Sequence, residues 1–382
     1  AVLNPKQFDC NYPYDQLSGC GVGFKLIQAY CINNDIAFEE IIEYLDLLAL
    51  SIGADIVPMT GENRVLAFYG LIQLNSNPRV GLRALMDVSL RENKLTISDL
   101  VFGIAPRINA AGSIGHAKKA VEILVEQDFN KAKLFASKIE ENNKVRKDLD
   151  QSITNEALKM IDENKKSTVV FSEKWHKGVI GIVASRLIES YYRPTIVFTE
   201  EDGLLTGSAR SVHDFDLYDA ISQCSHLCEK FGGHKYAVGL SIKKENFQEF
   251  LDAFEIAVSA TISKDQLSPK IEVDMQIDIN DVDEKLFRII KQFAPFGPHN
   301  LSPTFISKGV VDNGYGKKLG ADKSHLKINL KTILGTIAGI GFGMADSFDK
   351  IKDHQAFNIC YSIKENEWKG NKNLQLILSD IK

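Results

Sequence analysis

The spacing of hydrophobic residues predicts a largely helical first segment, residues 1–127. Between residues 35 and 50, apolar side chains recur every three or four positions, which is the spacing of one helix face. Asp35 stands where this helix would begin, and aspartate is a common N-cap residue. Gly53 and Pro58 then interrupt the pattern. Short extended pieces are expected between the helices.

An uninterrupted helical pattern extends from residue 129 to residue 164. Apolar residues such as Phe135, Ile139 and Ile153 recur mostly at helical spacing, and the segment contains no Gly or Pro. A helix of this length would extend roughly 50 Å at about 1.5 Å per residue. Residues 128–164 are therefore predicted to form a strut between two domains.

Strand and helix patterns alternate through residues 165–263, which is typical of a small α/β domain. The expected strands are residues 167–171, 195–199, 204–210 and 236–242, and the expected helices are residues 178–190, 216–230 and 245–262.

A polar linker at residues 263–269 leads to a region dominated by strands. Residues 271–279 alternate strictly between apolar and polar, as a half-buried strand does. Such short strands favour a small barrel, and an OB-fold, which often binds single strands, is expected for residues 268–382. The further strands are expected at residues 304–311, 326–330, 335–341, 356–363 and 374–378.

Composition and charge narrow the class of protein. The chain has 382 residues, of which 44% are hydrophobic and 25% charged, as is ordinary for a soluble protein of two or three domains. No apolar run reaches the ~18 residues of a membrane span. The six cysteines lack zinc spacing and are interpreted as reduced thiols of a cytoplasmic protein. The net charge of −5 argues against unspecific wrapping of nucleic acid, although residues 305–331 carry six lysines and two aspartates.

The segment of residues 103–117 contains Pro and Gly residues and is predicted to be a shaped loop between two helices. Arg107 could present two N–H groups to a phosphate, and Asn109 could bind backbone within the loop. His116 would begin the next helix, where its ring could meet an anion. Spacing alone favours a purely structural loop with a capping His.

Two motifs in the α/β domain have the chemistry of phosphate binding. Alternation places Ser208 and Arg210 on one side of a strand. Gly232 and Gly233 would let a backbone pass close to a ligand, beside the ring of His234. An edge strand and a hairpin connection explain the same residues without any ligand.

Asp55 follows an apolar helix, in a stretch too apolar for an ordinary surface acid. Its carboxylate could ligate a hard divalent cation, and a helix cap is the alternative. Phosphodiester hydrolysis by two metal ions needs several carboxylates. No Asp-His-His motif occurs in the chain.

Taken in order, these segments resemble the RecJ family of single-strand exonucleases. Residues 107–117 resemble its RINAAGRIGHA signature. Ser208-x-Arg210-Ser211, together with residues 232–240, resembles the SxRS and GGHxxAAGL motifs of DHHA1 domains. Residues 53–64 resemble its ADVVP…ENR segment, and the likeness extends over essentially the whole chain.

The resemblance implies an α/β multidomain fold, with the C-terminal part of a DHH domain, a long connecting helix, a DHHA1 domain and an OB-type β-barrel. It implies 5′-to-3′ hydrolysis of single-stranded DNA in repair and recombination, with two Mn²⁺ or Mg²⁺ ions. A helicase and a single-strand-binding protein are implied partners, and a monomer is expected. These domains would occupy residues 1–127, 128–164, 165–263 and 268–382.

The resemblance also assigns residues. Asp55, as metal ligand, and His116 are the implied catalytic residues. Ser208 and Arg210 would anchor a phosphate at the 5′ end of the strand. The full set of implied DNA- or phosphate-binding residues is Arg107, Asn109, Ser208, Arg210, Gly232, Gly233 and His234.

Some features depart from the family pattern. Ser113 stands where the signature has arginine. The family's acidic and Asp-His-His motifs are expected before Ala1, so this chain is expected to be an N-terminally truncated and inactive piece. Two alternatives stay open, namely a DHH-type phosphodiesterase acting on short oligonucleotides or cyclic dinucleotides, and a non-catalytic scaffold that binds single-stranded DNA.

Overall fold

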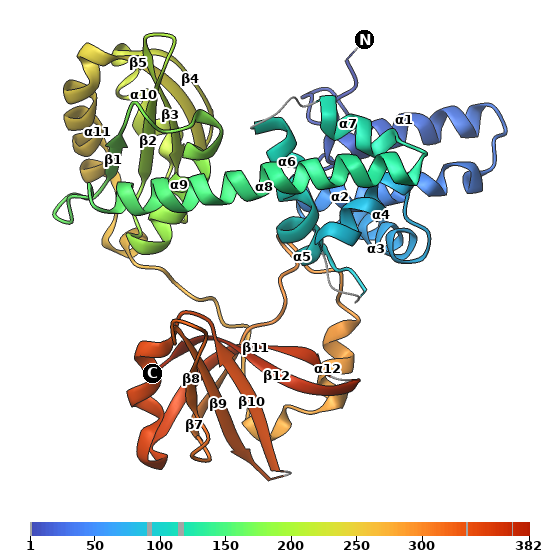
Figure 1. Cartoon of the computed structure of the whole chain (residues 1–382), viewed down its shortest axis with the longest axis vertical. Coiled ribbons are helices and arrows are strands. Elements are labelled where there is room, and N and C mark those ends of the chain that lie inside the picture. The colour runs from blue at the N-terminus through green and yellow to red at the C-terminus, as the bar shows by residue number, and fades with distance from the viewer. Residues whose placement is uncertain (1, 90–93, 114–117, 334, 369) are drawn as a thin grey trace. The chain divides into compact units, whose positions relative to one another are not determined.

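The chain forms two compact units, which are described separately (Figure 1). The computed structural model describes residues 2–89, 94–113, 118–333, 335–368 and 370–382. The first unit comprises Ala1–Pro78, Lys94–Val101 and Ile271–Lys382, and the second comprises Arg79–Asn93 and Phe102–Lys270. Within the described residues, no helix is both long and apolar enough to cross a membrane.

The first unit begins with a group of helices. Gly70 allows the helices α2 and α3 to pack closely, because a Cβ there would lie 2.3 Å from the carbonyl oxygen of Leu45. The prediction of one helix from an Asp35 cap is wrong. Asp35 has a φ of 52° and lies in a turn, and a 3₁₀ helix precedes α2. The elements are α1 (Gly19–Asn33), the 3₁₀ helix Phe38–Tyr44, α2 (Leu45–Ala54), α3 (Gly61–Ser76) and α5 (Ile97–Asp99).

The rest of the first unit is built on a seven-stranded sheet in the order β6-β7-β11-β12-β10-β9-β8. An isolated bridge between Asp312, just after β7, and Leu330 of β9 also links these two strands. Among the described residues, β7 and β9 form no continuous ladder that would close the sheet into a barrel. The elements are β6 (Met275–Gln276), α12 (Glu284–Lys291), β7 (Phe305–Val311), β8 (Lys317–Leu319), β9 (His325–Thr332), β10 (Gly335–Gly341), β11 (Ala356–Trp368) and β12 (Asn371–Ile381).

The strand expected over residues 271–279 is mostly absent, since only Met275–Gln276 pair with a neighbour. Ile271 and Val273 are 45% and 41% exposed. Ile277 and Ile279, at the end of the same pattern, do pack on the apolar core of the sheet. The alternation therefore marks a buried face only there, and it did not supply a pairing partner for the earlier residues.

The helical part of the second unit is dominated by α8, which is 30 residues long and is capped by the Asp128 carboxylate. The long helix is thus confirmed, although it ends at Leu158. The loop expected at residues 103–117 is wrong for its first part, because a π-helix at Leu100–Ile104 runs into α6. Pro106 lies just after the junction of the π-helix and α6, where it donates no backbone N–H to the preceding turn. The helices are α4 (Val80–Ser89), α6 (Ala105–Ser113), α7 (Lys118–Val125) and α8 (Phe129–Leu158).

The α/β part of the second unit has a five-stranded sheet in the order β1-β2-β3-β5-β4, with only β1 and β2 parallel. The helix expected at residues 216–230 ends at Ser222. A 3₁₀ helix at Ser225–Leu227 follows, and the expected last turn is instead the start of β4, whose backbone pairs with β5. The elements are β1 (Thr168–Phe171), α9 (Lys177–Ser190), β2 (Thr195–Glu201), β3 (Leu204–Arg210), α10 (Leu217–Ser222), β4 (Cys228–His234), β5 (Ala237–Lys243) and α11 (Phe247–Thr261).

The two faces of this sheet are covered unequally. Phe198 points to the face covered by α10 and α11, in a large apolar cluster with Phe250 and Phe254. Val197 points to the opposite face and packs with α9. The helix α9 contacts β2 and β3. Among the described residues, no helix packs directly on the part of this face over β5 and β4, and the candidate site lies there.

Candidate functional site

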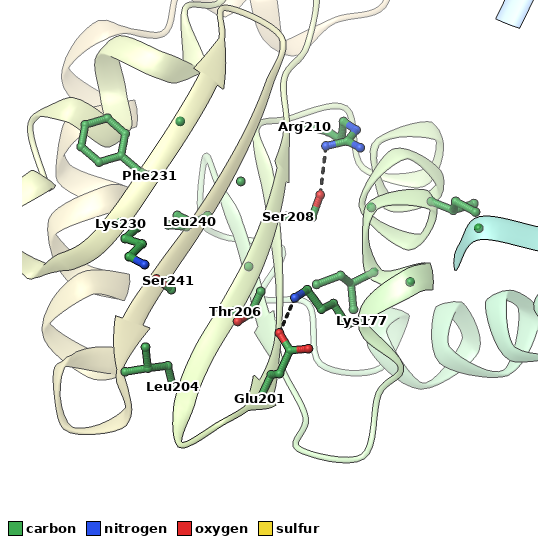
Figure 2. A pocket seen from close by; sticks show the side chains of 18 of the residues that line it. Lys177, Glu201, Leu204, Thr206, Ser208, Arg210, Lys230, Phe231, Leu240 and Ser241 are labelled. Atoms are coloured by element: carbon green, nitrogen blue, oxygen red, sulfur yellow. Dashed lines mark hydrogen bonds and ion pairs between the residues drawn. The ribbon is translucent and has the colours of Figure 1, made fainter. Parts of the chain in front are cut away.

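A channel of about 1090 Å³ lies on the open sheet face of the second unit (Figure 2). Its floor comes from β3, β5 and β4, and its walls come from α9 and α6. Strand register places Ser208 opposite Gly239, which in turn lies opposite Gly232. A Cβ added at either glycine would meet nothing within 4 Å. The floor beside Ser208 is therefore bare backbone, open to a ligand.

Arg210 and Ser208 form a donor pair at one end of the channel. The Arg210 Nη1 donates to the Ser208 Oγ at 3.0 Å and to the Ala209 carbonyl at 2.8 Å. Burial lowers the pKa of Arg210, and no carboxylate of the described residues forms an ion pair with it. A half-buried guanidinium with unused N–H groups and no counter-ion suits a phosphate.

Gly181 of α9 brings the helix against this pair. A Cβ at position 181 would lie 2.8 Å from the Arg210 Nη2 and 3.0 Å from the Ser208 Oγ. Only glycine therefore allows the helix and the donor pair to approach this closely without a shift.

A second row of polar side chains crosses the same floor. Thr206 of β3 lies opposite Ser241 of β5, which lies opposite Lys230 of β4. Figure 2 shows Lys230 beside Ser241 and, at the other side of Thr206, the ion pair between Lys177 and Glu201. Lys230 is exposed and has no ion-pair partner within the described part of the chain.

A buried polar network fixes the two walls to α8. Arg107 of α6 pairs with Glu140 of α8, with 2.5 Å between Nε and Oε2. Arg186 of α9 donates from Nε to the Asp150 Oδ2 at 2.8 Å, and Asp150 is 2% exposed. Arg146 lies between them, 8% exposed, and its pKa is lowered by burial. The helix α8 thus holds α6 and α9 in place on either side of the network.

The structure brings only some of the predicted residues to the channel. Ser208, Arg210, Gly232 and Asn109 line it. Arg107 is 8% exposed and bound to Glu140, so a DNA contact for this residue stays a prediction.

The other predicted residues lie elsewhere or are not described. Gly233 keeps the β4–β5 hairpin tight, since a Cβ there would lie 2.2 Å from the Ala237 carbonyl oxygen. His234 ends β4, exposed, with its Nδ1 accepting from the Tyr236 N–H at 3.3 Å. His116 lies outside the described residues.

Asp55, the predicted metal ligand, is exposed and caps the end of α2, where its N–H donates to the Ser51 carbonyl at 2.9 Å. Among the described residues, no group of three or more His, Cys, Asp or Glu side chains could hold a metal ion. The described part of the chain therefore does not fit a two-metal centre.

Among the channel residues that sequence reasoning missed are Gly181, Thr206, Lys230 and Ser241. Thr206 could have been found, because it shares the alternation of Ser208 and Arg210. Gly178 and Gly181, three residues apart in a helix, were a signal of close packing. Lys230 could not be predicted to lie on the sheet face, because its segment was expected to be a helix.

A second candidate surface lies on β9 in the first unit. Leu326, Ile328 and Leu330 are buried, so the alternating Lys327 and Lys331 point to the other face. Lys317 of β8 lies opposite Lys327. These lysines make one sheet face basic, as a surface that contacts a nucleic-acid backbone would be.

Two family descriptions match this chain: the DHHA1 domain over residues 131–260 and the RecJ OB domain over residues 273–380. The single-stranded-DNA-specific exonuclease RecJ of Escherichia coli is 30% identical over 409 residues, which cover 100% of this chain and 70% of that protein. The chain belongs to the RecJ family. This membership confirms the predicted resemblance and the α/β multidomain fold class with an OB-type domain.

Other RecJ proteins are also similar to this chain over part of their length. RecJ of Bacillus subtilis is 33% identical over 389 residues, and the chain spans only 48% of its length. The crystal structure of Thermus thermophilus RecJ with Mg²⁺ superposes with a TM-score of 0.85 at 26% identity, covering 97% of this chain and 57% of that one. A further structure of that RecJ contains Mn²⁺. The chain thus corresponds to about half of these RecJ proteins.

Proposed function

We propose that the chain is the strand-binding portion of a 5′-to-3′ exonuclease specific for single-stranded DNA, and that Ser208 and Arg210 bind the 5′-terminal phosphate. The observation that carries the proposal is the half-buried Arg210, which has no counter-ion among the described residues and is held beside Ser208 at one end of the channel. A terminal phosphate carries more negative charge than a phosphodiester, so an unpaired guanidinium favours the end of a strand over its interior.

The basic face of the OB-type domain supports the same function. Lys317, Lys327 and Lys331 would contact successive phosphates without regard to base sequence. A helicase and a single-strand-binding protein as partners, a monomeric state and a cytoplasmic location belong to the same proposal and are supported by membership of the family alone.

The family implies Mn²⁺ or Mg²⁺, which would polarise the scissile phosphate and supply the attacking hydroxide. Asp55 is our proposed ligand from the described residues, and His116 our proposed further catalytic residue. Since no group of three or more His, Cys, Asp or Glu side chains among the described residues could hold a metal ion, the remaining ligands would have to come from elsewhere. We therefore expect this chain by itself to bind DNA without degrading it.

The test uses a single-stranded oligonucleotide labelled at its 3′ end, with either a 5′-phosphate or a 5′-hydroxyl. Fluorescence anisotropy and product length are followed together in the presence of Mn²⁺. We expect tighter binding of the phosphorylated strand and no shortening. Equal binding of both strands would contradict the phosphate assignment. Shortening that Asp55→Ala abolishes would show that the chain holds a complete metal centre, against our expectation.

Replacing Gly181 by alanine is expected to weaken binding of the 5′-phosphorylated strand roughly tenfold, because the new Cβ would displace Arg210, whose phosphate contact is worth about 1.5–3 kcal/mol. Binding of the 5′-hydroxyl strand should change little. Ser190→Ala, an exposed position at the end of the same helix, is the matched control. An unchanged ratio between the two strands in Gly181→Ala would rule out this role of the glycine.

A further inference from the structure

The channel continues past the donor pair of Ser208 and Arg210. Its volume of about 1090 Å³ exceeds what a single phosphate needs. The row formed by Thr206, Ser241 and Lys230 lies one side-chain repeat along the strands from the row of Ser208. This repeat is about 6.6 Å, and neighbouring strands are about 4.8 Å apart.

No side chain on the floor separates the two rows. Gly239 and Gly232 complete the row of Ser208, and a Cβ on either would find open space. A group attached to a phosphate at Ser208 could therefore lie across the glycine backbone and reach the hydroxyls of Thr206 and Ser241.

The charge in the row of Thr206, Ser241 and Lys230 favours the binding of an anion. Lys230 has no ion-pair partner among the described residues, whereas Lys177 at the channel wall is already neutralised by Glu201. Thr206 and Ser241 add two hydroxyl donors. The carboxylates of Glu201 and Asp202, which also line the channel, would limit an anion to the part near Lys230.

A nucleobase fits this row less well. Base binding without sequence preference uses aromatic rings as stacking platforms. Phe231 is the aromatic residue among those that line the channel, but its ring packs on Tyr218, with 5.5 Å between centroids, in the apolar layer of the opposite sheet face. Figure 2 shows this ring pointing away from Lys230 and Ser241.

We propose that Thr206, Ser241 and Lys230 form a second anion subsite, which binds the outer phosphates of a strand carrying a 5′-di- or triphosphate. The inference rests on the proposed binding of the first phosphate by Ser208 and Arg210. The subsite only binds, and no bond is formed or broken there. The channel would thus accept strand ends that were never trimmed to a monophosphate.

The experiment compares three 3′-labelled oligonucleotides of one sequence, ending in a 5′-hydroxyl, a 5′-monophosphate or a 5′-triphosphate. Binding to the full chain is measured by anisotropy with a chelator present, so that no divalent ion contributes. The triphosphate is expected to bind roughly three- to tenfold more tightly than the monophosphate, as fits a partly exposed charge contact.

Lys230→Gln is expected to abolish this advantage while leaving the ratio of monophosphate to hydroxyl unchanged. Lys244→Gln is the control, because Lys244 is an exposed lysine of the same domain that pairs with Glu200 outside the channel. A triphosphate advantage that is absent, or that survives Lys230→Gln, would overturn the second subsite alone. If the parent chain does not distinguish monophosphate from hydroxyl, the proposed function fails, and the second subsite fails with it.

Discussion

Replacing Arg210 by alanine is expected to remove the preference of the chain for a 5′-phosphorylated single strand. Hydrogen bonds to a charged partner contribute about 1.5–3 kcal/mol, so the affinity should fall by roughly 10- to 150-fold. The 5′-hydroxyl strand should lose far less, since it offers Arg210 no terminal phosphate. Titration of both strands by anisotropy gives the ratio directly.

Two further variants sharpen this result. Arg210→Lys keeps the positive charge but not the planar pair of donors, and should retain an intermediate preference. Arg83→Ala removes an exposed arginine of the same unit that stacks on Phe129 away from the channel, and should leave the preference intact. If Arg210→Ala still preferred the phosphorylated strand, the terminal phosphate would have to bind elsewhere.

Replacing Asp150 by asparagine is expected to destabilise the second unit by roughly 2–4 kcal/mol. Breaking a fully buried pair costs about 3–5 kcal/mol, and the value here is reduced because the Arg186 side chain is 45% exposed. The main cause is Arg146, which would remain a buried cation with no carboxylate of the network beside it.

Urea unfolding measures this loss. Trp175 packs in the apolar cluster shared by α8 and α9, so its fluorescence follows the affected region in a Trp368→Phe background. Asp148→Asn, an exposed position on the same helix, should shift the midpoint little. Equal midpoints for the two variants would mean that the network does not stabilise the unit.

The donor pair could be predicted because it depends on local geometry. A strand puts every second residue on one face, so Ser208 and Arg210 had to point the same way. The long helix was equally predictable from the apolar spacing around Ile139 and Ile153, with no breaker to interrupt it. In both cases the information lies within a few consecutive residues.

The remainder of the channel depends on contacts between distant segments. Cys228–His234 forms a strand because β5 offers it a partner, which the helical spacing before Phe231 did not reveal. Only this pairing sets Lys230 beside Ser241. Likewise, Arg107 has the chemistry of a phosphate ligand, but it forms an ion pair with Glu140 of α8. Asp55 could not be tested as a metal ligand from sequence alone. A metal centre needs several ligands close together in space, and the residues around one carboxylate in the sequence do not reveal them.

The bare floor at Gly232 and Gly239 gives the channel an adjustable width. Because a Cβ at either position meets no atom within 4 Å, larger side chains could be introduced there without disturbing the packed side of the sheet. A substitution at either position can therefore change the size of the ligand that fits without changing the stability of the fold. A lineage could narrow the range of strand ends that the channel accepts by a single substitution at low cost to folding, so we expect substrate range to diversify readily at this floor.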